Sequence, residues 1–158
     1  MGGNVWTVAV AADGEAFAGT AGGGVFHSNT SGSSACPLPL SYWRTHTDDW
    51  PVDTLTLGSQ SYDQSELIAL LNTRRAEDDD VSVVLAHQLI ASKLNLANGA
   101  DSTPVGSVIA KSDQLLGGFA GKLPYAVERT SPEGRTMHHK ADILAAYNHG
   151  ALTPDCGP

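Results

Sequence analysis

Three short apolar-rich stretches near the start of the chain are separated by turn-forming segments, and the first of these stretches alternates. These stretches are VWTVAVA at 5–11, AFAGTA at 16–21 and VFHS at 25–28, separated by ADGE and GGG. A period of two is typical of strands, and Gly- or Asp-containing segments between such stretches are typical of tight turns. The pattern therefore predicts a short antiparallel β segment over residues 1–28, which needs further partners to be stable.

The rest of the chain has a helical period, with apolar residues recurring every three or four positions. Helices are predicted at 64–73, 81–99, 103–119 and 137–150.

Residues typical of helix ends support the first two helices. Asp63 or Ser61 can cap the first helix, Asp80 can cap the second, and Gly99 can end the second. The second helix also carries one predicted inward stripe: Val84, His87, Ile90 or Ala91, and Leu94.

Polar or Pro-containing segments join these elements. NTSGSSA at 29–35 reads as a flexible linker, CPLPL at 36–40 as extended chain, 55–63 as a short hairpin or loop, and 128–136 as a loop. We therefore predict a mainly α fold (α+β overall), in which about four helices form a domain at 36–158 after the linker and the β segment.

Composition narrows the function classes. The chain has 158 residues, 41% of them hydrophobic, which fits one domain or one domain with an appendage. Its 17 acidic and 9 basic residues give a net charge of −8 without a basic stripe, which argues against nucleic acid or an anionic membrane surface as a partner. No apolar run is long enough to span a bilayer. The start, MGGNVW, lacks the basic and apolar regions of a signal peptide.

Two cysteines bracket the predicted helical domain. Cys36 follows the linker and Cys156 stands third from the end. This placement favours a disulfide over two separate buried thiols, and a disulfide would indicate a secreted or cell-surface protein.

The first 28 residues resemble a known repeat. VWTVAVAADGEAFAGTAGGGVFHS is similar to one blade of the secreted β-propellers, through its D-G, A-G-T and G-G-G-V-F elements. The resemblance implies one blade or a hairpin, because a single repeat does not make a propeller.

Residues 36–156 resemble an uncharacterised bacterial domain found at the ends of secreted and cell-surface proteins. The resemblance rests on SYWRTHTDDWP, on LTLGSQSYDQSELIALLN, on LAHQLIASKLNLANGA and on AAYNHGALTPDC. This chain differs at Ser41, Arg44 and Thr47, where the family usually has Gly, Lys and Pro. The resemblance supports the pairing of Cys36 with Cys156 and implies a cellular context rather than an activity.

The segment SYWRTHTDDWP supports two hypotheses. In the structural one, Trp43 and Trp50 fill the core, while Arg44, His46 and Asp48 form a hydrogen-bonded set. In the functional one, aromatic rings form a platform for a sugar or polymer chain and polar neighbours orient it. The residues of that predicted binding site are Tyr42, Trp43, Trp50, Arg44 and Asp48.

Histidines and acidic residues suggest metal sites as alternatives. His87 on the inward stripe is most simply a core histidine bonded to a backbone carbonyl or a carboxylate. A Zn or Cu site would instead combine His46, His87 and an Asp with His139, or with His138 or His149 in its place. A Ca²⁺ site at the acidic run 78–80 is a further alternative to a solvated turn that caps the next helix.

Three functions remain open. We expect a non-catalytic accessory, binding or interaction module of a secreted or cell-surface protein, without a cofactor. Its partners would be other domains of a larger protein, and a carbohydrate or polymer. One alternative is a small metal-dependent enzyme that acts on an extracellular polymer through the histidine site. The other is a structural module that forms homo-oligomers through the edges of its β segment.

Overall fold

The protein divides into two compact units, Met1–Ser34 and Ala35–Pro158. This computed structural model describes residues 5–10, 16–20, 24–28, 35–73 and 80–156. The boundary falls within the predicted linker, of which residues 29–34 lie outside the described residues.

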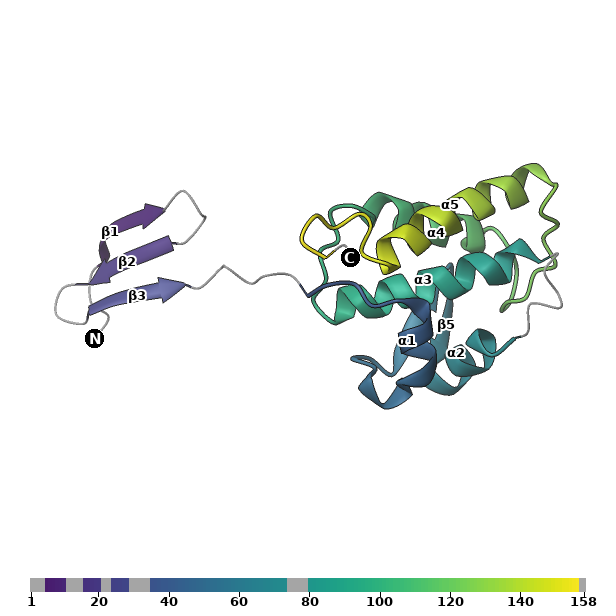
Figure 1. Ribbon diagram of the computed structural model, residues 1–158, viewed down its shortest axis with the longest axis horizontal. Coiled ribbons are helices and arrows are strands. Elements are labelled where there is room, and N and C mark those ends of the chain that lie inside the picture. Colours follow the sequence, from purple (N-terminus) through teal and green to yellow (C-terminus); the bar gives the residue numbers. More distant parts are fainter. Residues whose placement is uncertain (1–4, 11–15, 21–23, 29–34, 74–79, 157–158) are drawn as a thin grey trace. The chain divides into compact units, whose positions relative to one another are not determined.

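The first unit contains a three-stranded antiparallel sheet (Figure 1). Its strands are β1 (Val5–Val10), β2 (Ala16–Thr20) and β3 (Gly24–Ser28), in the order β1-β2-β3. The middle strand pairs on both sides, with Phe17 opposite Ala9 and His27. The three strands expected from the sequence pattern are confirmed.

The second unit is mainly α-helical, as expected, and contains one small hairpin. Its elements are α1 (Leu40–Thr45), a 3-10 turn η1 (Thr47–Asp49), β4 (Thr54–Leu57), β5 (Gln60–Asp63), α2 (Gln64–Leu71), α3 (Val81–Ala97), α4 (Gly106–Gly117) and α5 (Pro132–Asn148). The short helix α1 adds a fifth to the four predicted.

Helix α3 lies at the centre of this unit and contacts all four other helices (Figure 1). Eleven of its 17 residues are buried, so the single predicted stripe was too narrow. Val84 and His87 on that stripe are only half-buried, whereas Leu85 and Leu89 outside it are fully buried. The hydrophobic pattern did not predict this wider burial, because polar side chains on α3, such as Asn95, are buried as well.

Helix α5 begins earlier than the sequence pattern indicated. The expected loop at 128–136 is wrong from Pro132 onward, because Ser131 caps the helix by accepting a hydrogen bond from the Gly134 backbone N–H. A Cβ atom at Gly134 would lie 2.0 Å from the carbonyl oxygen of Glu128. Glycine therefore lets the loop approach the first turn of the helix.

Of the two alternatives predicted for residues 55–63, a hairpin or a loop, the hairpin is confirmed. This hairpin, β4–β5, leads directly into α2. Asp63 caps α2 and forms a capping box with Glu66, so Asp63 rather than Ser61 is the cap. At the hairpin turn, the Gly58 backbone N–H donates to Asp113 of α4. Lys93 of α3 pairs with the same carboxylate at 2.6 Å.

Candidate functional site

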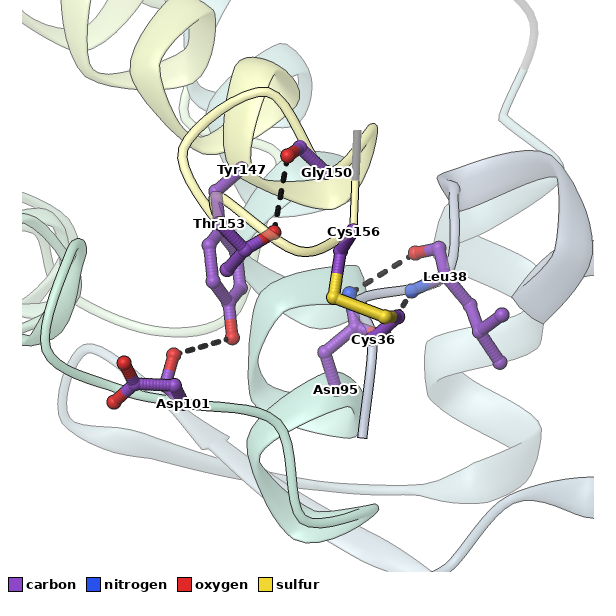
Figure 2. The surroundings of a disulfide bond; sticks show 8 residues. All are labelled: Cys36, Leu38, Asn95, Asp101, Tyr147, Gly150, Thr153 and Cys156. Carbon is purple, nitrogen blue, oxygen red and sulfur yellow. Dashed lines mark hydrogen bonds between the residues drawn. A yellow bond between two sulfur atoms is a disulfide. The ribbon is translucent and has the colours of Figure 1, made fainter. Parts of the chain in front are cut away.

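A disulfide between Cys36 and Cys156 closes the helical unit, as predicted (Figure 2). The two residues are 120 positions apart in sequence, and their Cα atoms lie 5.4 Å apart. Next to the bond, the Ala35 backbone N–H donates to the Gly99 carbonyl at the end of α3. The two ends of the domain are thus fixed to each other and to its central helix.

Asn95 of α3 is fully buried and uses its whole amide beside the disulfide. Its oxygen accepts from the Leu38 N–H at 2.8 Å and from the Trp43 indole at 3.0 Å. Its nitrogen donates to the Leu38 carbonyl and to Asn148 of α5. One amide therefore joins the entering chain, α1, α3 and α5 (Figure 2 shows the contacts with Leu38).

Asn148 extends these bonds along α3. Its oxygen also accepts from Ser92 at 2.9 Å, and its nitrogen donates to both the backbone and the side-chain oxygen of Gln88 at 3.1 Å. We call Ser92, Asn95 and Asn148 the asparagine cluster. Because all three are buried and bonded, the cluster fixes how α3 and α5 pack.

Tyr147 and Gly150 complete this end of the unit. The Tyr147 hydroxyl donates to the Asp101 carbonyl at 2.9 Å (Figure 2). Burial, with a smaller contribution from the Asp101 charge, raises the pKa of Tyr147 to about 12. Gly150 has φ +79°, and a Cβ atom there would lie 2.5 Å from the Cys156 carbonyl oxygen.

The two tryptophans of the predicted platform lie in the core. Trp43 is 1% exposed and Trp50 is 8% exposed, and the Trp50 indole donates to the Trp43 carbonyl at 2.8 Å. These are the positions of the structural hypothesis, with each indole N–H bonded as expected. An exposed aromatic platform would have to rest on Tyr42.

The polar residues of this segment pair differently from the expected set. Tyr42 donates to Asp49 at 2.8 Å and stacks on His46 with 4.2 Å between ring centroids. Arg44 and Asp48 are exposed and make no hydrogen bond or ion pair with the described residues. The expected hydrogen bonds among Arg44, His46 and Asp48 were therefore wrong, since Tyr42 and Asp49 take that role.

The predicted metal-binding histidines are distributed over different elements. His46 follows α1, His139 is exposed on α5, and His149 is the exposed C-cap of α5. His87 and His138, by contrast, line one cavity. Within the described residues, no group of three or more His, Cys, Asp or Glu side chains is arranged to hold a metal ion. Of the proposed Ca²⁺ segment, residues 78 and 79 lie outside the described residues.

This cavity, the α3–α5 groove, has a volume of about 740 Å³ and combines apolar and polar walls. Its apolar lining residues are Leu40, Val81, Val83, Val84, Pro124 and Ala126. Its polar lining residues are Thr73, Asp80, His87, Gln88, Arg129, His138 and Asp142. A volume of this size and mixed lining are typical of ligand sites.

The histidines in the groove have protein partners. His87 Nε2 lies 2.8 Å from the Leu70 carbonyl oxygen, as expected of a core histidine. His138 Nδ1 lies 3.2 Å from Asp142, whose side chain is 65% exposed. Arg129 is exposed and makes no hydrogen bond or ion pair with the described residues. Among the described residues, the groove thus places Arg129 beside an apolar wall without an ion-pair partner.

Asp80 shapes the base of the groove. Its carboxylate accepts from the backbone N–H and the hydroxyl of Ser82, at 2.9 and 2.6 Å. It also accepts from the backbone N–H groups of Ala126 and Val127, at 2.9 and 3.0 Å. The residue that caps α3 therefore also fixes the loop that carries Arg129.

Sequence reasoning missed Arg129 and Asp142. The i,i+4 spacing of His138 and Asp142 on a predicted helix was a usable signal for that pair. The sequence carried no signal for Arg129. Its place in the groove depends on a hydrogen bond that Asp80 accepts from the Ala126 backbone, 46 positions away in sequence.

Comparison with protein-family models, with curated proteins and with solved structures finds no match for this chain. The two resemblances noted in the sequence therefore remain predictions. None of the helices within the described residues is long and apolar enough to cross a membrane.

Proposed function

We propose that Ala35–Pro158 is a non-catalytic binding module of a secreted or cell-surface protein, and that its ligand face is the α3–α5 groove. The observation that carries this proposal is the disulfide, which joins residues 120 positions apart. Such bonds persist in oxidising compartments and stabilise small extracellular domains. The buried polar groups near the bond are used in holding the fold.

A carbohydrate or other polymer is the proposed ligand. Arg129, Gln88 and His138 offer hydrogen-bonding groups next to apolar walls, a combination that suits a sugar ring with one polar edge and one apolar face. Other domains of a larger protein would place the module near that polymer.

The test is retention on immobilised polysaccharides, with the size of each polymer measured before and after incubation. We expect at least one polymer to bind without being shortened, and Arg129→Gln to weaken that binding by about tenfold. Tyr42→Ala is the matched control for the platform hypothesis and should leave binding unchanged. Polymer shortening, or loss of binding in Tyr42→Ala alone, would contradict the proposal.

A metal-dependent enzyme is the second candidate, because two of the histidines considered for a metal site, His87 and His138, line the same groove. Elemental analysis of protein purified without chelator or metal-affinity resin tests it. One Zn or Cu per chain, lost in His138→Gln, would favour this candidate. Its absence would favour the binding module.

Self-assembly is the third candidate and concerns the N-terminal sheet. Within the described residues, β1 and β3 each pair on one side only, so each is an edge strand. Light scattering of the full chain and of a variant without residues 1–34 tests this proposal. An unchanged number of chains per particle would contradict it.

A further inference from the structure

A second cavity lies between α4 and α5, away from the residues that line the α3–α5 groove. It has a volume of about 690 Å³, and Leu115 and Phe119 supply its accessible apolar surface. Met137 lies beneath this surface and is fully buried, so the cavity borders the core. Phe119 is half-buried and stacks on Tyr125, with ring centroids 4.8 Å apart and ring planes 11° from parallel. The stack holds the Phe119 ring in one orientation at the edge of the cavity.

The four lysines of the chain form two groups that differ in their contacts. Lys93 pairs with Asp113, and Lys122 pairs with Glu66. Lys111 of α4 and Lys140 of α5 both line the α4–α5 cavity and make no hydrogen bond or ion pair with the described residues. Glu133 also lines it without pairing with either lysine.

These two lysines give the cavity a positive charge within an acidic protein. Counting side chains, two lysines against one glutamate leave a local charge of +1, whereas the whole chain carries −8. Unpaired lysines are common on surfaces, but here they come from two different helices and flank one apolar hollow. An anion bound there would meet an ammonium group from each helix, next to an apolar surface.

We propose that the α4–α5 cavity binds an amphipathic organic anion, that is, a flat apolar body with one carboxylate or sulfonate group. The apolar body lies against Phe119 and Leu115, and the acid group lies between Lys111 and Lys140. This proposal is independent of the function proposed for the α3–α5 groove, since the two cavities share no lining residue.

Titration of the full chain with 2-naphthoate tests the proposal, with 2-naphthamide as the neutral probe of matched shape. Amide chemical shifts from ¹H–¹⁵N spectra report the location of binding. We expect saturable shifts concentrated at 111–119 and 133–140, and a Kd for 2-naphthamide at least about fivefold higher because it lacks the charge. The proposal would be overturned if no saturable shifts appeared up to about 5 mM 2-naphthoate. A Kd above that value corresponds to a binding free energy weaker than roughly −3 kcal/mol. Shifts centred on the α3–α5 groove would also overturn the proposal.

Three variants separate charge from packing. Lys111→Gln combined with Lys140→Gln should raise the Kd for 2-naphthoate by about fivefold or more, and leave that for 2-naphthamide unchanged. The corresponding double change to Arg should keep the Kd within about twofold. Arg44→Gln removes a cation on α1 that has no ion-pair partner among the described residues, and it should have no effect. Equal affinity of the double Gln variant and the unmodified chain for 2-naphthoate would overturn the proposal.

Discussion

The two ends of the α3–α5 pair use their polar residues differently. The two helices run side by side in the same direction (Figure 1), so their C-terminal ends meet at the disulfide and their N-terminal ends border the groove. At the C-terminal end, Asn95, Asn148 and Tyr147 are fully buried and bonded. At the N-terminal end, Arg129 has no partner within the described residues. The C-terminal end therefore fixes how the two helices pack, whereas the N-terminal end, which we call the open end, leaves the Arg129 side chain without a bond to any described residue.

At the open end, hydrogen bonds of Asp80 hold the loop that precedes Arg129 against the start of α3. Four hydrogen bonds hold its carboxylate at the start of α3 and fix the loop that carries Arg129. A binding site gains affinity when its loops are fixed before the ligand arrives. The comparison therefore predicts large effects on stability at the disulfide end and a small effect when the Arg129 side chain itself is replaced.

Removal of the disulfide should have the largest effect. Replacing Cys36 and Cys156 by Ser frees a loop of 120 residues, and the chain-entropy model gives a loss of about 4–5 kcal/mol in the free energy of unfolding. Thermal unfolding by calorimetry measures the loss, and reduction of the native protein should reproduce it. A native free-thiol count of two would contradict the pairing itself.

Asn95→Leu should have the next largest effect. It leaves the buried Trp43 indole and both backbone groups of the half-buried Leu38 without these partners, at a cost of about 3 kcal/mol. Urea unfolding measures this cost. Asn98→Ala is the matched control, because Asn98 is exposed at the end of the same helix. Equal midpoints for the two variants would show that the asparagine cluster does not hold the fold.

Alkaline pH should weaken the same end of the unit through Tyr147. The folded state raises the pKa of Tyr147 to about 12, so it favours the neutral hydroxyl. This stabilisation is complete below pH 10 and is lost as the pH rises from about 10 to 12, by about 2–3 kcal/mol. Tyr147→Phe cannot ionise and should lose less stability over this interval. Parallel pH curves for the two proteins would disprove the assignment.

Gly150 and Gly99 provide a matched pair with a smaller expected difference. Both have positive φ, at +79° and +93°, which disfavours alanine by about 1 kcal/mol in each case. Only at Gly150 would the new Cβ also meet the Cys156 carbonyl, whereas Gly99 has open space. Gly150→Ala should therefore unfold at a lower urea concentration than Gly99→Ala. The reverse order would show that the disulfide end adjusts easily.

The local elements of this fold could be predicted from sequence better than their packing. The caps at Asp63 and Asp80 depend on neighbouring residues: Asp80 was predicted, and Asp63 was one of two predicted candidates. The predicted start of α5 is too late, because the prediction assigns S-P-E-G to a loop, although Ser131 and Pro132 are typical of a helix start. The burial of polar positions on α3 could not be predicted, because it depends on partners for Asn95 and Ser92 that lie 53 and 56 residues away.

The candidate site shows the same limit. The Trp-rich segment was conspicuous in sequence, yet Trp43 and Trp50 are core residues. The groove instead combines single residues from segments far apart. Of its polar residues, the sequence pointed to His87 and His138 only for a metal site, and to Asp80 only for a helix cap or a Ca²⁺ site. A cavity arises from the packing of several elements, so no local sequence pattern predicts it.

Arg129→Gln should have the smallest effect on stability and so provides the sharpest test of the comparison. Arg129 is exposed and makes no hydrogen bond or ion pair with the described residues, so its loss should change the free energy of unfolding by less than about 0.5 kcal/mol. Urea unfolding checks this, and Asp80→Asn in the same groove is the contrasting variant. Asp80→Asn weakens bonds to Ser82 and Val127, and should cost about 2 kcal/mol. A loss at Arg129 as large as that at Asp80 would mean that Arg129 holds the fold, and that the groove is not the open end of the domain.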